Sequence, residues 1–149
     1  MYETLFAYAC LMSAGLIPQS EYGEYLNTHF MKTPDNELPL NLEWCFSDKN
    51  KTIAVIFEHC GNSMDYNAFG CFLMRKLNNV YFQNGIDIET FCSKLYIVWQ
   101  HLPYEISQVE PFWTMSYASD PLSWGDEKQT RELCEKMLHF YGTERFRTE

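Results

Sequence analysis

Hydrophobic residues recur at helical spacing along most of the chain. In residues 3–16, apolar side chains return every three or four positions, and Gly15 and Pro18 close this pattern. Residues 18–30 repeat it, with Pro18 placed where the first turn of a helix tolerates proline. Because almost no residues separate the two stretches, we expect two helices that pack as antiparallel neighbours.

The helical pattern is stronger after residue 63. Ser63 is expected to cap a helix that runs to about Gln83, and Asn84-Gly85 is expected to end the helix and turn the chain. The side chains expected to point inward from this helix are Ala68, Phe69, Phe72, Leu73, Leu77, Val80 and Tyr81.

Two further helices are predicted in the last third of the chain. Asp87 is expected to cap the first of them, and Pro103 stops it. Asp126 and Gln129 have the spacing of a capping box for the last helix, which Gly142 ends. The inward face of the first of these helices consists of Phe91, Cys92, Leu95, Val98, Trp99 and Leu102.

Residues 40–58 allow two interpretations. Alternating apolar residues from 40 to 46, followed by a β-rich run from 52 to 57, fit a hairpin. Alternatively, Ser47 caps a helix. The apolar face of that helix would consist of Ile53, Ile56, Phe57 and Cys60. We favour helices here, with the hairpin as the alternative.

These elements predict one mainly α-helical domain, residues 1–149, built as a bundle-like array of six or seven helices. The alternative is an α+β domain with a hairpin at about 40–58. The charged tail from about residue 143 is expected to fray. No run approaches the roughly 18 apolar residues of a membrane span. The amino-terminal segment carries Glu3 and no basic residue before Lys32, which disfavours an export signal and makes a cytoplasmic location our expectation.

Composition excludes a disordered chain and argues against a disulfide scaffold. Hydrophobic residues make up 46% of the 149 residues and aromatic residues 17%, which suffices for a real core. Six cysteines are present, none in a C-x-x-C pair, and most lie within apolar patterns. We therefore expect buried free thiols.

The charge of the chain is unevenly distributed. The net charge is −9, and residues 1–48 hold seven acidic residues and one basic residue. Such a surface disfavours nucleic acid and anionic membranes and favours a basic protein partner. The candidate partner-binding residues in this acidic part are Glu21, Glu24, Asp35, Glu37, Glu43 and Asp48.

Sequence motifs for catalysis or cofactor binding are missing. The four histidines form no H-x-x-x-H pair, and the chain has no zinc knuckle, no G-x-S-x-G and no glycine-rich phosphate-binding loop. We therefore expect no enzyme activity, no cofactor and no metal site.

Residues 110–126, EPFWTMSYASDPLSWGD, form an apolar connection between two predicted helices. Prolines at 111 and 121 stiffen it. One interpretation is that Trp113 and Trp124 are buried rings that pin the connection onto the helical body, and we favour it. The other is an aromatic pocket of a small enzyme or ligand-binding protein. Its residues would be Trp113, Tyr117, Asp120, Trp124 and Asp126.

Two stretches resemble a known group of proteins. They are EYLNTHFMKTPDNELPLNLEWCFSDKNKTI at 24–53 and EPFWTMSYASDPLSWGDEKQTRELCEKM at 110–137. Together they resemble small bacterial proteins of polymorphic-toxin neighbourhoods, in which immunity proteins are common. The resemblance implies a mostly helical domain that neutralises a cognate toxin. An acidic chain without catalytic motifs suits this role, because many such toxins are basic. We therefore predict an acidic, immunity-type inhibitor that occludes a basic toxin domain.

Overall fold

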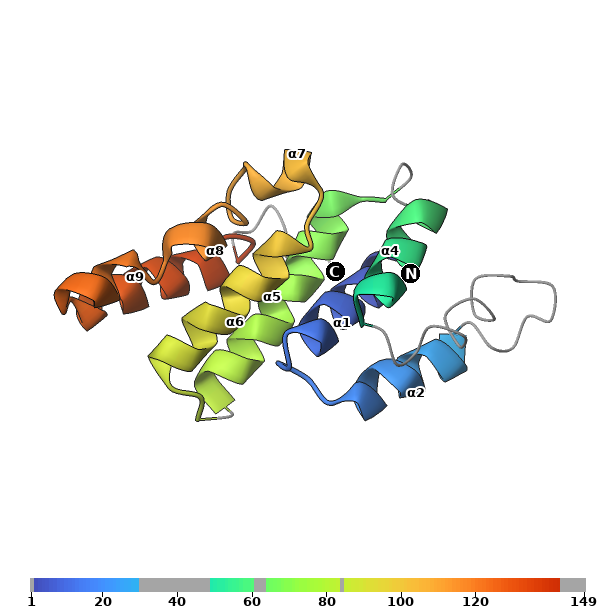
Figure 1. Cartoon of the computed structure of the whole chain (residues 1–149), viewed down its shortest axis with the longest axis horizontal. Coiled ribbons are helices and arrows are strands. Elements are labelled where there is room, and N and C mark those ends of the chain that lie inside the picture. Colours follow the sequence, from blue (N-terminus) through green and yellow to red (C-terminus); the bar gives the residue numbers. More distant parts are fainter. Residues whose placement is uncertain (1, 30–48, 61–63, 84, 143–149) are drawn as a thin grey trace. The chain divides into compact units, whose positions relative to one another are not determined.

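The computed structural model describes residues 2–29, 49–60, 64–83 and 85–142 and contains helices and no strand in these ranges (Figure 1). The mainly α-helical prediction is thus confirmed. None of the helices in these ranges is both long enough and apolar enough to cross a membrane. The chain groups into two compact units, Met1–Phe69 and Gly70–Glu149, and the boundary falls within helix α5 (Tyr66–Gln83).

The first unit is organised around α1 (Tyr2–Ser13), which packs against α2 (Gln19–His29) and α4 (Lys49–Cys60) (Figure 1). Most of α1 is buried, as expected of a helix that is apolar on nearly all sides. The ring of Phe6 lies with its centroid 6.2 Å from that of Phe57 and 5.2 Å from that of Phe69. Phe6 and Phe69 are fully buried in the core of this unit, whereas Phe57, which was expected on the apolar face of its helix, is partly exposed at the edge of that core.

Helix α4 decides between the helix and the hairpin for the described part of residues 40–58. Residues 49–60 are helical, so the hairpin alternative is wrong for this half of the segment. The reason is the spacing of its apolar residues, because Ile53 and Ile56 lie three apart and are both buried. The expected cap Ser47 and the run from 40 to 46 lie outside the described residues.

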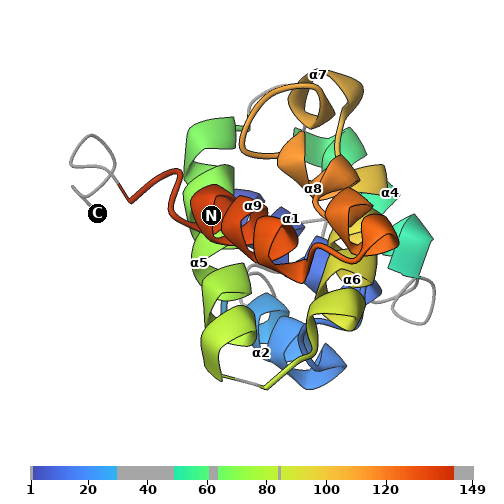
Figure 2. The ribbon, with the colours of Figure 1, turned by 90° about the vertical axis from the view of Figure 1, so that its left-hand side faces the viewer.

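The second unit is built on α5, α6 (Ile88–Gln100) and α9 (Glu127–Leu138). Helices α5 and α6 run side by side (Figure 1), and α9 lies against both (Figure 2). The rings of Tyr81 and Phe91 are 5.1 Å apart across α5 and α6. At Gly70 on α5, an added Cβ would lie 2.6 Å from Cζ of Tyr141, so the missing side chain lets the Tyr141 ring approach the helix.

Helices α6 and α9 begin at the capping residues predicted from the sequence. Asp87 accepts a hydrogen bond from the backbone N–H of Thr90, and Asp126 accepts one of 3.0 Å from that of Gln129. At the start of α5, Asp65 accepts hydrogen bonds from the backbone N–H groups of Asn67 and Ala68. The expected cap of this helix, Ser63, lies outside the described residues.

The connection between α6 and α9 is more helical than predicted. It contains α7 (Tyr104–Ser107), α8 (Thr114–Tyr117) and the 3₁₀ helix η2 (Asp120–Trp124). Gly125, with φ of 79°, ends η2, and the N–H of Asp126 donates a hydrogen bond of 2.9 Å to the carbonyl oxygen of Pro121. These short helices fix the path of the connection and so position the aromatic side chains that it carries.

Candidate protein-binding surface

Four aromatic rings form a continuous row on the second unit. Along α6, the ring centroids of Tyr96 and Trp99 are 5.6 Å apart. The next ring is Trp113, whose centroid is 6.1 Å from that of Trp99 and 6.3 Å from that of Tyr117. We call Tyr96, Trp99, Trp113 and Tyr117 the aromatic row. Such spacings are those of favourable aromatic pairs, so each ring holds its neighbour in place.

Hydrogen bonds fix the middle of the aromatic row to the backbone. The indole Nε1 of Trp99 donates a hydrogen bond of 2.9 Å to the carbonyl oxygen of Ser107. The backbone N–H of Trp113 donates one of 2.9 Å to the carbonyl oxygen of Val109. Since the sequence neighbours Phe112 and Met115 are buried, the backbone that carries Trp113 is anchored in the core.

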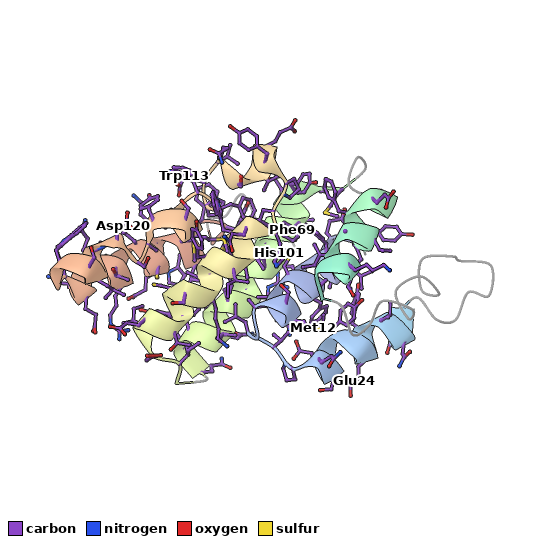
Figure 3. The ribbon with its side chains drawn as sticks, viewed as in Figure 1. Met12, Glu24, Phe69, His101, Trp113 and Asp120 are labelled. Atoms are coloured by element: carbon purple, nitrogen blue, oxygen red, sulfur yellow. The ribbon has the colours of Figure 1, made fainter. Side chains whose placement is uncertain are left out.

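Two rings of the aromatic row, Tyr96 and Trp113, are open to solvent, and so is Tyr104 on α7. Trp113 is 40% exposed, Tyr96 is similarly exposed, and Tyr104 on α7 is 78% exposed. Figure 3 shows Trp113 and Asp120 on the connection between α6 and α9. Rigid, half-exposed tryptophan and tyrosine rings are typical of the residues that carry binding energy in protein interfaces.

The segment around the aromatic row carries negative charge only. Residues 95–127, which we call the acidic aromatic segment, contain no lysine or arginine. The Glu110 carboxylate accepts a hydrogen bond from the Thr114 hydroxyl, which holds this charge against the side chain of the residue that follows Trp113. The carboxylates of the segment are Glu105, Glu110, Asp120, Asp126 and Glu127. Chemically, aromatic faces beside carboxylates suit arginine and lysine side chains.

The residues of the predicted aromatic pocket have separate roles. Trp113 and Tyr117 are in contact, as the pocket hypothesis requires. Asp126 is engaged as the cap of α9, and Asp120 is exposed on η2. Trp113 is 40% exposed and Trp124 is 64% exposed, so the expectation of buried rings is wrong for both. Other apolar residues anchor the connection instead, because Phe112 and Met115 are buried beside Trp113 and Pro121 is the buried residue of η2.

The acidic amino-terminal candidates are only partly described. Glu21 is half-buried and Glu24 exposed, both on α2, and Figure 3 labels Glu24 on the outer side of this helix. The other four candidates, Asp35, Glu37, Glu43 and Asp48, lie outside the described residues.

A pair of thiols lies near the acidic aromatic segment. The Sγ atoms of Cys92 on α6 and Cys134 on α9 are 3.8 Å apart, and both side chains are buried. The other cysteines whose side chains are described, Cys10 and Cys71, are also buried and free, which confirms the prediction of buried free thiols for these four.

A polar network flanks the thiol pair on α9. The hydroxyl of Tyr81 donates a hydrogen bond of 3.2 Å to Oε2 of Glu135 and accepts one of 3.3 Å from Nη1 of Arg131. Nε of Arg131 also donates to Glu127 at 2.9 Å. Burial raises the pKa of Tyr81, and the hydrogen bond from Arg131 opposes that rise. The phenol therefore stays neutral and links α5 to α9.

The described residues offer no cluster of three or more histidine, cysteine or acidic side chains that could hold a metal ion. His101, at the end of α6, is half-buried, and desolvation lowers its pKa, which favours the neutral ring.

Sequence reasoning missed the aromatic row as a surface. It assigned Trp99 to an inward face and gave Tyr96 no role. The available signal was the spacing of Tyr96 and Trp99, which lie three apart and so share one edge of a helix. The chain matches no protein-family model, no curated protein and no solved structure.

Proposed function

We propose that this chain is a non-enzymatic binding protein that docks a basic partner protein on the aromatic row. Its function is that of a bacterial, cytoplasmic immunity-type inhibitor, which neutralises a cognate toxin domain by covering it. The resemblance of residues 24–53 and 110–137 to proteins of toxin neighbourhoods supports the inhibitor class, and the surface chemistry supports the docking site.

One observation carries this proposal. A row of aromatic rings, with Trp113 40% exposed, lies within a segment that has carboxylates and no lysine or arginine. Arginine or lysine side chains of a partner can stack on these rings and pair with the flanking carboxylates. Charge of one sign also accelerates encounter with a partner of the opposite sign.

The docking face proposed here lies in residues 95–127, whereas the sequence alone suggested the amino-terminal third. Glu21 and Glu24 remain candidates for a secondary contact. Exposed carboxylates alone contribute little to affinity, since ion pairs at the rim of an interface are screened by water and salt. Aromatic anchors supply the larger part of the binding energy.

The test uses the protein encoded by the gene adjacent to this one. Calorimetry at low and high salt measures its Kd for the chain and for Trp113→Ala. We expect nanomolar to micromolar binding that weakens with salt, and a Kd about 30-fold higher for Trp113→Ala, equivalent to a hot spot of about 2 kcal/mol. The matched control is Phe140→Ala, because Phe140 is 42% exposed and lies outside the acidic aromatic segment.

The readout for inhibition is the growth of cells that produce both proteins. Wild type and Phe140→Ala should protect the cells, whereas Trp113→Ala should protect them less. Absence of binding, or binding with the same Kd at both salt concentrations, would contradict the inhibitor with an electrostatic docking face. Binding that Trp113→Ala leaves unchanged would move the docking site away from the aromatic row.

A further inference from the structure

The thiols of Cys92 and Cys134 are close enough to react with each other. Their Sγ atoms are 3.8 Å apart, and a disulfide requires about 2.05 Å. Both side chains point into the packing between α6 and α9, since Cys92 is 3% exposed and Cys134 is fully buried. The two sulfur atoms would therefore have to approach each other by about 1.8 Å to form the bond.

The surroundings give the two thiols different roles. The hydrogen bond with the Cys134 thiol lowers the pKa of Cys92 against the effect of burial, and the positive charge of Arg131 lowers it further. That hydrogen bond and burial raise the pKa of Cys134. Cys92 is thus the more readily ionised thiol of the pair, so we expect it to react first and Cys134 to follow.

Burial restricts the oxidant to a small molecule. A thiol that is 3% exposed gives little room to a bulky disulfide such as oxidised glutathione, whereas hydrogen peroxide is hardly larger than water. Cys10 provides an internal comparison, because burial raises the pKa of its thiol and keeps it protonated. Peroxide should therefore spare Cys10 and attack Cys92.

We propose that Cys92 and Cys134 form a redox-active dithiol, which hydrogen peroxide closes to a disulfide between α6 and α9. The Cys92 thiolate attacks one peroxide oxygen, the O–O bond breaks, and Cys92 becomes a sulfenic acid with release of hydroxide. Cys134 sulfur then attacks the Cys92 sulfur, the S–O bond breaks, and hydroxide leaves. In total, two thiols and one peroxide give one disulfide and two water molecules.

The disulfide would join the two ends of the acidic aromatic segment, because Cys92 precedes residue 95 and Cys134 follows residue 127. Oxidation would thereby restrain the relative motion of α6 and α9, and the aromatic row lies on α6 and on the connection between these two helices. The bond itself is independent of the proposed docking function, and only its effect on the partner rests on that function.

The test is peptide mapping of the whole chain after treatment with hydrogen peroxide. Free thiols are alkylated, the protein is cut with trypsin, and the peptides are identified by mass spectrometry. We expect peptide 77–94, which holds Cys92, to be linked to peptide 132–136, which holds Cys134, with release by dithiothreitol. The linked protein should also unfold at a higher Tm than the reduced protein, since the bond constrains the unfolded chain.

The control is Cys134→Ser, which removes the second thiol but keeps a hydroxyl of similar size that can donate a hydrogen bond to Cys92, and circular dichroism checks that it folds. In this variant, peroxide should leave Cys92 as sulfenic or sulfinic acid without a crosslink. The proposal would be overturned if both cysteines of wild type were still alkylated after peroxide treatment. It would also be overturned if a disulfide between other cysteines formed before the one between Cys92 and Cys134. Because no partner is present in this experiment, its failure would leave the docking function untouched.

Discussion

The indole N–H of Trp99 donates a hydrogen bond of 2.9 Å to the carbonyl oxygen of Ser107, which joins the end of α6 to the end of α7. This bond satisfies a part-buried carbonyl and fixes the orientation of the Trp99 ring. Trp113 packs against that ring in an edge-on arrangement, with an angle of 66° between the ring planes. The position of the exposed Trp113 ring therefore depends on a hydrogen bond that Trp113 does not make.

Trp99→Phe tests this dependence. The substitution keeps an aromatic ring but removes the N–H, so the Ser107 carbonyl loses its partner. We expect a loss of about 1–2 kcal/mol in the free energy of unfolding, measured by urea denaturation. Tyr96→Phe is the matched control, since Tyr96 is exposed and its ring stays in place. Equal stability of Trp99→Phe and wild type would show that this bond contributes nothing.

Trp124→Ala should change stability little. The side chain of Trp124 is 64% exposed, so its removal takes away little buried apolar area. We expect the free energy of unfolding to fall by less than about 1 kcal/mol in urea denaturation, as for most surface substitutions. A loss of 3–5 kcal/mol, which a buried tryptophan would give, would contradict the exposed position of this ring.

Gly70→Ala should destabilise the second unit. The added Cβ would collide with the ring of Tyr141, including its hydroxyl oxygen, so the buried ring must move. Overpacking of this kind costs about 1–3 kcal/mol, and the higher helix propensity of alanine returns about 1 kcal/mol. We expect a net loss of about 1 kcal/mol in thermal or urea unfolding.

The control for this prediction is a double-mutant cycle with Tyr141→Ala. Without the ring there is no collision, so Gly70→Ala in that background should be neutral or stabilising. If Gly70→Ala costs the same with and without Tyr141, the collision is not the cause.

His101 should make stability depend on pH in the mildly acidic range. Desolvation lowers its folded-state pKa below 6.5, so the unfolded chain binds a proton more readily than the folded one. The contribution of His101 is therefore fully present above pH 6.5 and is lost as the pH falls through its folded-state pKa. We expect wild type to lose more stability than His101→Gln between pH 7.5 and 5.5, by urea denaturation. Equal losses in both proteins would contradict a half-buried ring that desolvation keeps neutral.

Local signals in the sequence predicted the local features of the fold. The caps Asp87 and Asp126 lie where short-range rules place them, because a cap needs only its own side chain and the N–H groups two or three residues ahead. The helix over residues 49–60 was also predictable from the spacing of Ile53 and Ile56.

The candidate site was not predictable in this way, because it depends on contacts distant in sequence. Trp99 and Trp113 meet only because α7 and α8 return the chain to α6, and no local pattern encodes that path. The same holds for Trp124, whose hydrophobic character suggested burial. Its exposure follows from the 3₁₀ turn that buries Pro121 instead.

The charge pattern of the acidic aromatic segment also has a practical consequence. Because residues 95–127 contain no lysine, reagents that react with amines cannot attach to this part of the chain. Amine coupling to a sensor chip, or labelling with an amine-reactive dye, must therefore use sites outside it. A protein immobilised in this way keeps the side chains of the aromatic row chemically unmodified, and replacing the flanking Lys94 and Lys128 by arginine would move the attachment points further away.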